Sequence, residues 1–301
     1  MNSYSMTQVE TLTGISSHTL RVWERRYSFI KAHRSATNIR YYTDEQVKDL
    51  LNIGILIRNG YRISAIDKME RSKIHELVRE YLLSDSKVSG DLINALVLTM
   101  INLDEEDFNL IFQDYVYSEG FVAAVTQLIY PFLNLVGGLW TTNKATPAQE
   151  HFISNLIRQK ILAAIDQLPQ PDEDSPRVIL FLLEKESHEI GLLLAYYIFK
   201  QMGWKVYYLG QNVPRENIPP MTKVVKPDLL MTMFVIPRQE KVEDIIKDLL
   251  DKTGIKMLYS GNPVHFQNDQ LINNARYVQN PDELSALLGI RSKHKSVLQE
   301  S

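Results

Sequence analysis

The chain has no cysteine and no long hydrophobic run, and each absence excludes a class of protein. Without cysteine there can be no disulfide, no thiol redox sensor and no zinc site with cysteine ligands. No run of about eighteen apolar residues is present that would indicate a transmembrane helix, and no apolar signal-peptide core follows Met1. We therefore expect a cytoplasmic protein without a membrane partner. With 301 residues, of which 45% are hydrophobic and 23% charged, two or three globular domains are expected.

Charge is distributed unevenly along the sequence, although the net charge is only −3. Residues 1–75 contain twelve Lys and Arg against seven Asp and Glu, whereas the remainder contains twenty-one against twenty-nine. A basic first quarter joined to an acidic body is typical of a polyanion-binding head on a sensor or scaffold.

The N-terminal pattern predicts a helix-turn-helix. Residues 6–12 form a short amphipathic pattern, and Gly14 in the turn that follows tolerates a left-handed conformation. Ser16 or Ser17 then caps a second helix, residues 18–26. The second helix of such a pair enters the DNA major groove.

A basic, aromatic and turn-prone stretch follows, from Tyr27 to Tyr42, and suits a β-wing that contacts phosphates beside the groove. Thr43 then caps a helix over residues 44–59, with Gln46 completing a capping box. The candidate DNA-binding residues on the second helix and the wing are Ser17, His18, Arg21, Arg25, Arg26, Lys31, His33, Arg34, Arg40 and Tyr41.

The middle of the chain is predicted to form a helical bundle. Apolar spacing predicts amphipathic helices over residues 73–84, 88–102, 104–117, 119–139 and 147–167. We expect Pro131 to kink the fourth of these, because proline cannot donate a helical hydrogen bond. No heptad repeat is sustained after the head, so dimerisation must come mainly from elsewhere.

Three residues of the bundle are candidates for a site. Thr146, Pro147 and Gln149 form the start signal of the last helix, which places Glu150 and His151 in its first turn. Trp140 lies just before, across a short loop. A structural role is open for each: Trp140 in the core, Glu150 on the helix dipole and His151 on the surface.

The last third alternates strands and helices after a Pro-rich and acidic linker, residues 169–175. The predicted strands are 178–183, 205–209, 229–236, 256–259 and 277–278, and the helices are 191–202, 215–225, 240–252 and 281–288. Such alternation indicates a parallel, doubly wound sheet with right-handed crossovers.

The loop after the first of these strands contains Glu186, His188 and Gly191 in the order Glu-x-His-x-x-Gly. Open α/β sheets bind ligands at loops that leave their strands. A histidine there suits a metal ligand whose second ring nitrogen donates to the nearby carboxylate. The alternative is a surface pair of a histidine and an acid.

The head resembles a known family. Residues 19–26 (TLRVWERR), 40–43 (RYYT) and 60–66 (GYRISAI) look like the winged-helix domain of MerR-type regulators, in the correct order over about seventy residues. The resemblance implies a dimer on palindromic promoter DNA, with Arg21 and the basic wing residues touching it.

The other motifs resemble cobalamin proteins. Glu186-x-His188-x-x-Gly191 is similar to the cobalamin-binding domain. Trp140 followed, after nine intervening residues, by Glu150-His151 is similar to the bundle of light-responsive MerR-type regulators of carotenoid genes. The resemblance implies that His188 binds the cobalt from below and Trp140 covers the upper face of the corrin. Glu150 and His151 would lie near an adenosyl group.

Some positions depart from the family's pattern. Cobalamin domains bury the nucleotide tail in a channel lined by small groups, which Thr232 and Gly261 match. Phe234 is bulkier than the usual leucine, and Ser260 stands where a glycine is usual. Thr141 stands where relatives with a stable photoproduct carry histidine, so we predict a cobalamin response without a trapped bis-imidazole state.

The sequence thus predicts a winged helix-turn-helix head (1–72, expected to be all-α apart from the wing), a helical bundle (73–168), a linker (169–175), a flavodoxin-like (Rossmann-like) domain (176–292) and a tail (293–301). The function implied by the resemblance is a transcription factor, not an enzyme. Adenosylcobalamin would assemble its dimers into a tetramer on the operator, and light would release it by breaking the cobalt–carbon bond. The alternative is a regulator that has lost its cofactor and uses the last two domains as an oligomerisation or protein-interaction scaffold. A cobalamin-dependent enzyme is disfavoured, because no substrate barrel is encoded.

Overall fold

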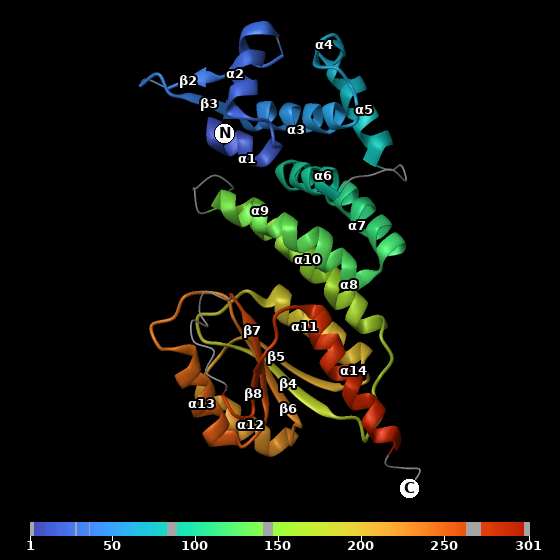
Figure 1. Cartoon of the computed structure of the whole chain (residues 1–301), viewed down its shortest axis with the longest axis vertical. Helices are drawn as coiled ribbons and strands as arrows, with labels where there is room; N and C mark the ends of the chain where they lie inside the picture. Colours follow the sequence, from blue (N-terminus) through green and yellow to red (C-terminus); the bar gives the residue numbers. More distant parts are fainter. Residues whose placement is uncertain are drawn as a thin grey trace. The chain divides into compact units, whose positions relative to one another are not determined.

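The computed structural model of the chain describes residues 3–27, 29–35, 37–82, 89–140, 147–262 and 272–297. The chain forms two compact units, Met1–Leu156 and Ile157–Ser301 (Figure 1). The boundary falls inside α10 (Pro147–Gln167), so this helix begins in the first unit and ends in the second. The domain boundaries predicted from the sequence stay a prediction.

The first unit begins with a helix-turn-helix, as predicted. It consists of α1 (Met6–Thr13) and α2 (Ser17–Arg26). Gly14 between them has a φ of +67°, a left-handed conformation that side chains disfavour. Ser16 is the cap of α2, because its Oγ accepts the Thr19 backbone N–H at 3.1 Å.

A small antiparallel sheet accompanies these helices. It has the order β1 (Ser3–Ser5), β3 (Arg40–Thr43) and β2 (His33–Arg34). The hairpin of β2 and β3 lies in the stretch predicted as a wing. The third strand, β1, was not predicted, because three residues are too few to show an alternating pattern. The head is therefore helical, as expected, apart from this small sheet, in which β2 and β3 lie in the expected wing and β1 is an addition.

The capping box at the start of α3 (Asp44–Arg58) is confirmed. Thr43 Oγ1 accepts the Gln46 N–H at 3.4 Å, and Gln46 Oε1 accepts the Thr43 N–H at 3.0 Å. The apolar face of α3 is buried and forms the core of the head, with Val47, Leu50, Leu51, Ile53, Ile55 and Leu56. Two further helices follow, α4 (Ile63–Ile66) and α5 (Arg71–Leu82).

The predicted bundle is present in the first unit. Its helices are α6 (Ser89–Asn102), α7 (Glu105–Glu119), α8 (Phe121–Ala123), the π-helical turn η1 (Ala124–Ile129), α9 (Tyr130–Trp140) and the start of α10. α6, α7 and α10 begin and end within two residues of the predicted bounds, and so does α5, which was predicted as the first helix of the bundle. The side chains between them are apolar and buried, including Leu96, Phe108, Leu128, Phe132 and Ile153.

The predicted helix over residues 119–139 is not continuous. Gly120, with a φ of +86°, separates α7 from α8, and η1 then interrupts the α-helical hydrogen bonding. In this turn Tyr130 donates its N–H to the carbonyl of Val125, five residues back. Pro131 follows directly and has no N–H to continue the regular pattern. The irregularity we expected at Pro131 therefore lies in the turn before it.

The second unit contains the predicted parallel sheet. Its strands are β4 (Arg177–Leu183), β5 (Lys205–Val213), β6 (Leu229–Phe234), β7 (Met257–Gly261) and β8 (Ala275–Tyr277). They are all parallel and lie in the order β5-β4-β6-β7-β8, which is the flavodoxin-like order.

Helices cover both faces of this sheet (Figure 1). On one face α11 (Glu189–Gln201) packs beside α14 (Pro281–Val297), and on the other α12 (Ile218–Val225) packs beside α13 (Val242–Thr253). A short 3-10 turn, η2 (Arg215–Asn217), precedes α12. The core under α12 and α13 is aliphatic and aromatic, with Ile179, Phe181, Leu230, Phe234, Ile245 and Leu249.

Two boundaries in this unit differ from the prediction by four residues or more. β5 extends to Val213 rather than Leu209, and register shifts against β4 break the alternation that a sequence pattern reveals. α14 continues through Gly289 to Val297, although glycine disfavours helix interiors, and so reaches into the predicted tail. Among the helices in the described ranges, none combines the length and the hydropathy needed to cross a lipid bilayer.

Candidate functional site

Glu186 and His188 lie in the loop that follows β4. From β4 the chain crosses to β5 on one side and later returns to β6 on the other side. Such a reversal of strand order marks the position where open α/β sheets bind ligands, outside the carboxyl ends of the strands. The loop is placed there because the buried apolar strand ends at Leu183 and polar residues follow it.

The carboxylate of Glu186 is fully buried and connects this loop to the residues that follow β6, the strand beside β4. One oxygen, Oε1, lies 2.6 Å from His188 Nδ1 and accepts the His188 backbone N–H at 3.2 Å. The other, Oε2, accepts the backbone N–H groups of Val235 and Ile236, just after β6, at 2.9 and 3.1 Å. The sequence carried no signal for these last two donors, because backbone N–H groups are common to nearly all residues.

These hydrogen bonds keep Glu186 ionised. Burial by itself would raise the pKa of its carboxyl group. The hydrogen bonds from the His188 ring and from the backbone N–H groups of Ile236, Val235 and His188 outweigh this and lower the pKa to about 2. At neutral pH the group is therefore a carboxylate that can only accept hydrogen bonds.

His188 is oriented by this carboxylate while its ring faces outward. Its side chain is 54% exposed, although Glu186 is not exposed at all. Because a carboxylate is only an acceptor, Nδ1 of the neutral ring carries the proton and Nε2 holds the lone pair. This is the tautomer that a metal ligand bound through Nε2 requires. No cluster of three or more His, Asp or Glu side chains able to hold a metal ion by themselves occurs in the described part of the chain.

The residue after the histidine ties the loop to two other elements. Glu189 forms an ion pair with Arg158 on α10, with Nε and Oε1 2.5 Å apart. Its second oxygen accepts the Tyr208 hydroxyl of β5 at 3.0 Å. Burial and the negative charge of Glu189 both raise the pKa of Tyr208. Tyr208 also stacks on the ring of Tyr196, in the middle of α11, so that β5 contacts this helix both at its first residue and further along.

Thr232 and Phe234 lie at the carboxyl end of β6. Both are completely buried, but they differ in what surrounds them. The Phe234 ring packs in the core under α12 and α13, with the guanidinium of Arg238 over it at 5.6 Å. The hydroxyl Oγ1 of Thr232 has no hydrogen-bond partner among the residues described. A buried hydroxyl without a partner is costly, so this atom is suited to a ligand that supplies one.

Gly261 and Ser260 end β7, beside β6. Gly261 has a φ of +136°, and a Cβ placed on it would lie 2.0 Å from the carbonyl oxygen of Phe234. Only glycine permits this approach of the two strand ends. Ser260 pairs with Met233 in the sheet and is half-buried.

The other predicted cofactor residues are distributed over both units. Gly191 lies in the first turn of α11 and is half-buried. Trp140 is the last residue of α9, but its side chain and the whole of Thr141 lie outside the described residues. Glu150 and His151 are on the first two turns of α10, with His151 Nε2 3.7 Å from Glu150 Oε2 and both side chains accessible.

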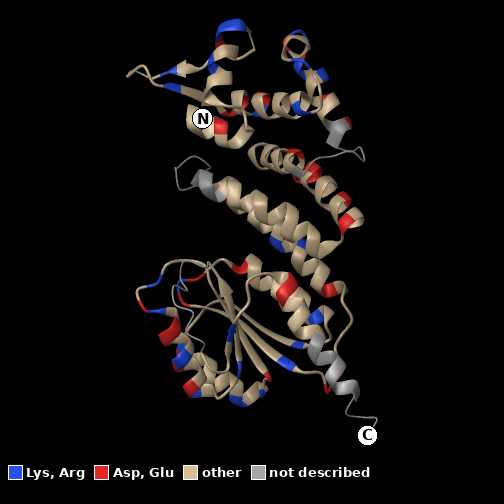
Figure 2. Cartoon of the chain, in the orientation of Figure 1, with Lys and Arg blue, Asp and Glu red and all other residues tan. Residues whose placement is uncertain are grey.

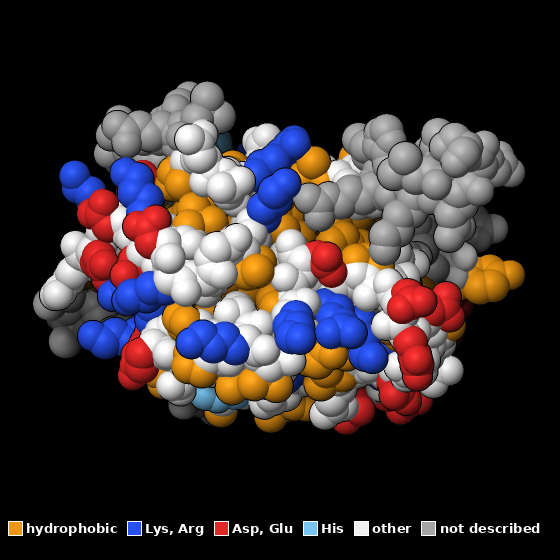
Figure 3. Space-filling view, turned by 90° about the horizontal axis from the view of Figure 1, so that it is seen from below, with side chains coloured by type: hydrophobic (Ala, Val, Ile, Leu, Met, Phe, Trp, Pro, Cys, Tyr) orange, Lys and Arg blue, Asp and Glu red, His pale blue; other side chains and the backbone are white. Residues whose placement is uncertain are grey.

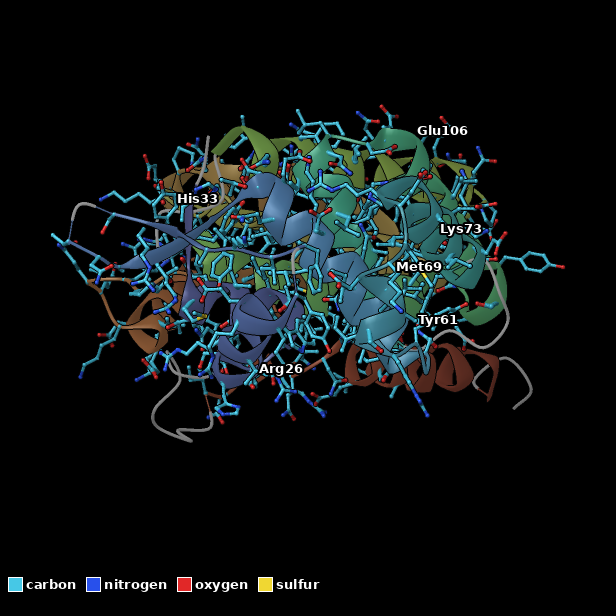
Figure 4. The ribbon with its side chains drawn as sticks, turned by 90° about the horizontal axis from the view of Figure 1, so that it is seen from above. Arg26, His33, Tyr61, Met69, Lys73 and Glu106 are labelled. Atoms are coloured by element: carbon cyan, nitrogen blue, oxygen red, sulfur yellow. The ribbon has the colours of Figure 1, made fainter. Side chains whose placement is uncertain are left out.

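The predicted recognition helix presents its basic residues to solvent. His18, Arg21, Arg25 and Arg26 are exposed and Ser17 is half-buried, whereas Leu20 and Trp23 are buried beneath them. The colouring by charge shows Lys and Arg at α2, on the hairpin and at α4 and α5 (Figure 2). Seen from above, Arg26 of α2, His33 of the hairpin and Tyr61 before α4 come from three separate segments of the head (Figure 4).

The hairpin carries the remaining candidates for DNA contact. Lys31, His33 and Arg34 are exposed, whereas Arg40 and Tyr41 are half-buried. The His33 ring stacks on Tyr41 across the strands at 5.4 Å. Arg40 pairs with Glu24 of α2 at 2.9 Å, so this guanidinium fastens the hairpin to the recognition helix. Sequence reasoning missed that role, because the two residues are sixteen positions apart.

A cavity of about 300 Å³ lies at the opposite end of the sheet from His188. It is lined where β6, β7 and β8 begin, by Leu229, Lys256, Met257, Asn274, Ala275 and Leu288, among others. Seen from below, the second unit shows Lys and Arg side chains among apolar ones (Figure 3). Ligands of such sheets bind at the carboxyl ends of the strands, whereas this cavity lies where the strands begin. The cavity is therefore separate from the candidate site.

Comparison with known proteins bears on both sites. Residues 4–73 match the MerR HTH family regulatory protein, and residues 92–164 match the B12 binding domain. The chain joins a MerR-type helix-turn-helix domain to a B12-binding domain. The first contains α1, α2 and the hairpin, and the second runs from α6 into α10 and includes Glu150 and His151.

Two relatives extend over most of the chain. The HTH-type transcriptional repressor CarA of Myxococcus xanthus is 29% identical over 252 residues, which cover 80% of each protein. The HTH-type transcriptional repressor CarH of the same organism is 25% identical over 253 residues, 82% of this chain and 84% of the relative. Both are named as repressors, in line with the expectation of a regulator rather than an enzyme.

A solved structure shares the fold. The Methanosarcina barkeri monomethylamine corrinoid protein aligns with a TM-score of 0.53 and 17% identity, covering 67% of this chain and 100% of that chain. At this identity the likeness establishes the fold alone, a flavodoxin-like sheet with a helical part.

Proposed function

We propose that this protein is a transcriptional regulator whose operator binding is gated by cobalamin held at His188. The observation that carries the proposal is the pair of Glu186 and His188, in which a buried carboxylate fixes the ring from Nδ1 and leaves the imidazole exposed. When bound, cobalamin supplies a cobalt that an imidazole nitrogen can ligate and, in the adenosyl form, a cobalt–carbon bond that light can cleave.

The side chains of the second unit fit the tail of such a cofactor as well. The unpartnered hydroxyl of Thr232 is available to hydrogen-bond a buried polar atom of the nucleotide tail. Gly261 brings β7 against β6 at the same end of the sheet. On the bundle, Trp140, Glu150 and His151 are proposed to cover the adenosyl group. The form of the cofactor that we propose is therefore adenosylcobalamin.

The head is proposed to bind a palindromic promoter element as a dimer. α2 would enter the major groove with His18 and Arg21, and the hairpin would contact phosphates with Lys31 and Arg34. Cobalamin can change this binding only if it favours one arrangement of the chain over another. We propose that the adenosyl form favours a tetramer on the operator and that light reverses this.

The first experiment is retention of the cofactor. The purified protein is mixed with adenosylcobalamin in darkness, desalted and measured by its visible spectrum. We expect His188→Ala to lower the affinity at least about tenfold, because the cobalt loses its protein ligand. The matched control His75→Ala removes an exposed histidine of α5 and should retain the cofactor fully.

A second variant separates binding from folding. Thr232→Val keeps the shape of the side chain but removes the unpartnered hydroxyl, so the free protein should be equally or more stable to heat. If the hydroxyl binds the nucleotide tail, cobalamin affinity should nevertheless fall. A protein that stays colourless in excess cobalamin would contradict the proposal and favour the scaffold alternative.

The gating is tested by sizing and DNA binding together. The protein is sized with and without adenosylcobalamin, in darkness and after illumination, and each sample is titrated with an operator duplex. We expect the largest assembly and the tightest binding in darkness with cofactor. Identical assemblies and affinities in all four samples would contradict gating, even if the cofactor is bound.

A further inference from the structure

A buried carboxylate joins the bundle to the head within the first unit. Asp91 lies on α6 and its side chain is completely buried. Its two oxygens contact the end of α3: Oδ1 lies 2.5 Å from Arg58 Nε, and Oδ2 accepts the Asn59 side-chain amide at 3.1 Å. A charge without exposure requires such partners, so α3 and α6 are held in one register at this point.

The same cluster reaches the end of α1. Arg58 Nη1 donates to the Thr13 carbonyl at 3.4 Å. The side-chain amide of Asn94 on α6 lies between the Leu12 carbonyl and Arg58 Nη2. In the amide orientation that satisfies both neighbours, it donates to the Leu12 carbonyl at 3.1 Å and accepts from Arg58 Nη2 at 2.6 Å. Carbonyls of the last helical turn have no partner within their own helix, and a cation near them is favourable. Side chains of α3 and α6 therefore complete the C-terminus of α1.

Close packing makes this arrangement specific. A Cβ on Gly54 of α3 would lie 3.3 Å from Arg58 Nη1, tighter than most such contacts, and 3.4 Å from the Thr13 carbonyl oxygen, at the edge of ordinary van der Waals contact. Glycine at this position lets the end of α1 and the guanidinium approach the helix. Thr13, completely buried, is followed directly by the turn at Gly14 and then by α2.

We propose that Asp91 is a positioning residue for DNA binding. Through Arg58 and Asn94 it fixes the end of α1, and the end of α1 fixes the turn from which the recognition helix starts. The first helix of the bundle, α6, thereby contributes a residue to the geometry of the DNA-binding head, one position before the range that matches the B12 binding domain. This inference rests on the proposed DNA binding but not on the proposed cofactor.

The test compares two affinities of the full-length protein. An operator duplex is first selected from a random-sequence library with the unaltered protein, and a random duplex serves as reference. Asp91→Asn keeps the shape but removes the charge that holds Arg58. We expect about tenfold weaker operator binding, while binding to the random duplex changes less than about threefold because phosphate contacts remain.

The matched control is Asp49→Asn, which breaks the ion pair of Asp49 with Arg71, another α3 contact with a neighbouring helix. It should change neither affinity by more than about twofold. Asn94→Ala is a milder variant that leaves Asp91 and Arg58 in place, and we expect a smaller loss of the same kind. If heat unfolding shows that Asp91→Asn does not fold, the operator and random-duplex affinities of Asn94→Ala test the positioning role instead.

Two results would overturn the positioning role. One is an equal loss on operator and random duplexes, which a merely destabilised head would give. The other is unchanged operator affinity in both folded variants. If the unaltered protein selects no duplex at all, the proposed DNA binding itself fails.

Discussion

Replacing Glu186 by glutamine tests the physical basis of the candidate site. The pKa of about 2, against an ordinary value of 4.5, means that the folded loop favours the carboxylate over a neutral group. At about 1.4 kcal/mol per pKa unit, the preference is on the order of 3 kcal/mol. Glu186→Gln keeps the shape of the side chain but imposes a neutral amide at every pH.

The sign of the pH dependence follows from the lowered pKa. The stabilisation by the carboxylate is fully present above pH 4.5 and is lost as the pH falls toward 2, because the unfolded loop takes up the proton first. At about pH 3, roughly 2 kcal/mol of it should already be lost. The difference between the unaltered protein and Glu186→Gln should shrink accordingly.

The assay is hydrogen exchange at the amides of Val235 and Ile236, which donate to Glu186. We expect Glu186→Gln to accelerate their exchange roughly a hundredfold at neutral pH and only about tenfold at pH 3. Glu240→Gln, which removes a half-exposed carboxylate paired with Arg215, is the control and should leave these two amides unchanged. An acceleration that is the same at both pH values would refute the reasoning, because it would not depend on the charge.

Three further predictions concern other parts of the chain. Gly261→Ala should unfold the second unit or lower its melting temperature strongly, because the new Cβ would meet the Phe234 carbonyl. The control Gly203→Ala has open space around it and should cost only about 1 kcal/mol of stability. Similar melting temperatures of the two variants would contradict this. Lys31→Ala should weaken binding to all duplexes and reduce the salt dependence by about one counterion, measured by titration at several salt concentrations. Ser16→Ala removes the cap of α2 and should cost about 1 kcal/mol of stability, measured by urea unfolding.

The sequence was sufficient where the information is local. Capping residues such as Thr43 and Gln46 determine a helix start through hydrogen bonds only three residues apart, and the apolar runs of β4 and β6 determine buried strands. The spacing of Glu186 and His188 is also local, and the two side chains do form the predicted pair. Alternation of strands and helices was enough for a parallel sheet, because right-handed crossovers leave few topologies.

The tertiary structure decided what depends on residues far apart in the sequence. The backbone N–H groups that keep Glu186 ionised come from some fifty residues away, and no residue type identifies them. The glycine requirement at position 261 arises only because β7 lies against the end of β6. Likewise the sequence shows Asp91 and Arg58 only as ordinary charged residues of two helices. Only the packing of α3 on α6 buries the Asp91 carboxylate against the Arg58 guanidinium. Local hydrogen bonds and apolar periodicity are determined by neighbouring residues. The burial of side chains and the pairing of charges arise only after folding has brought distant segments together.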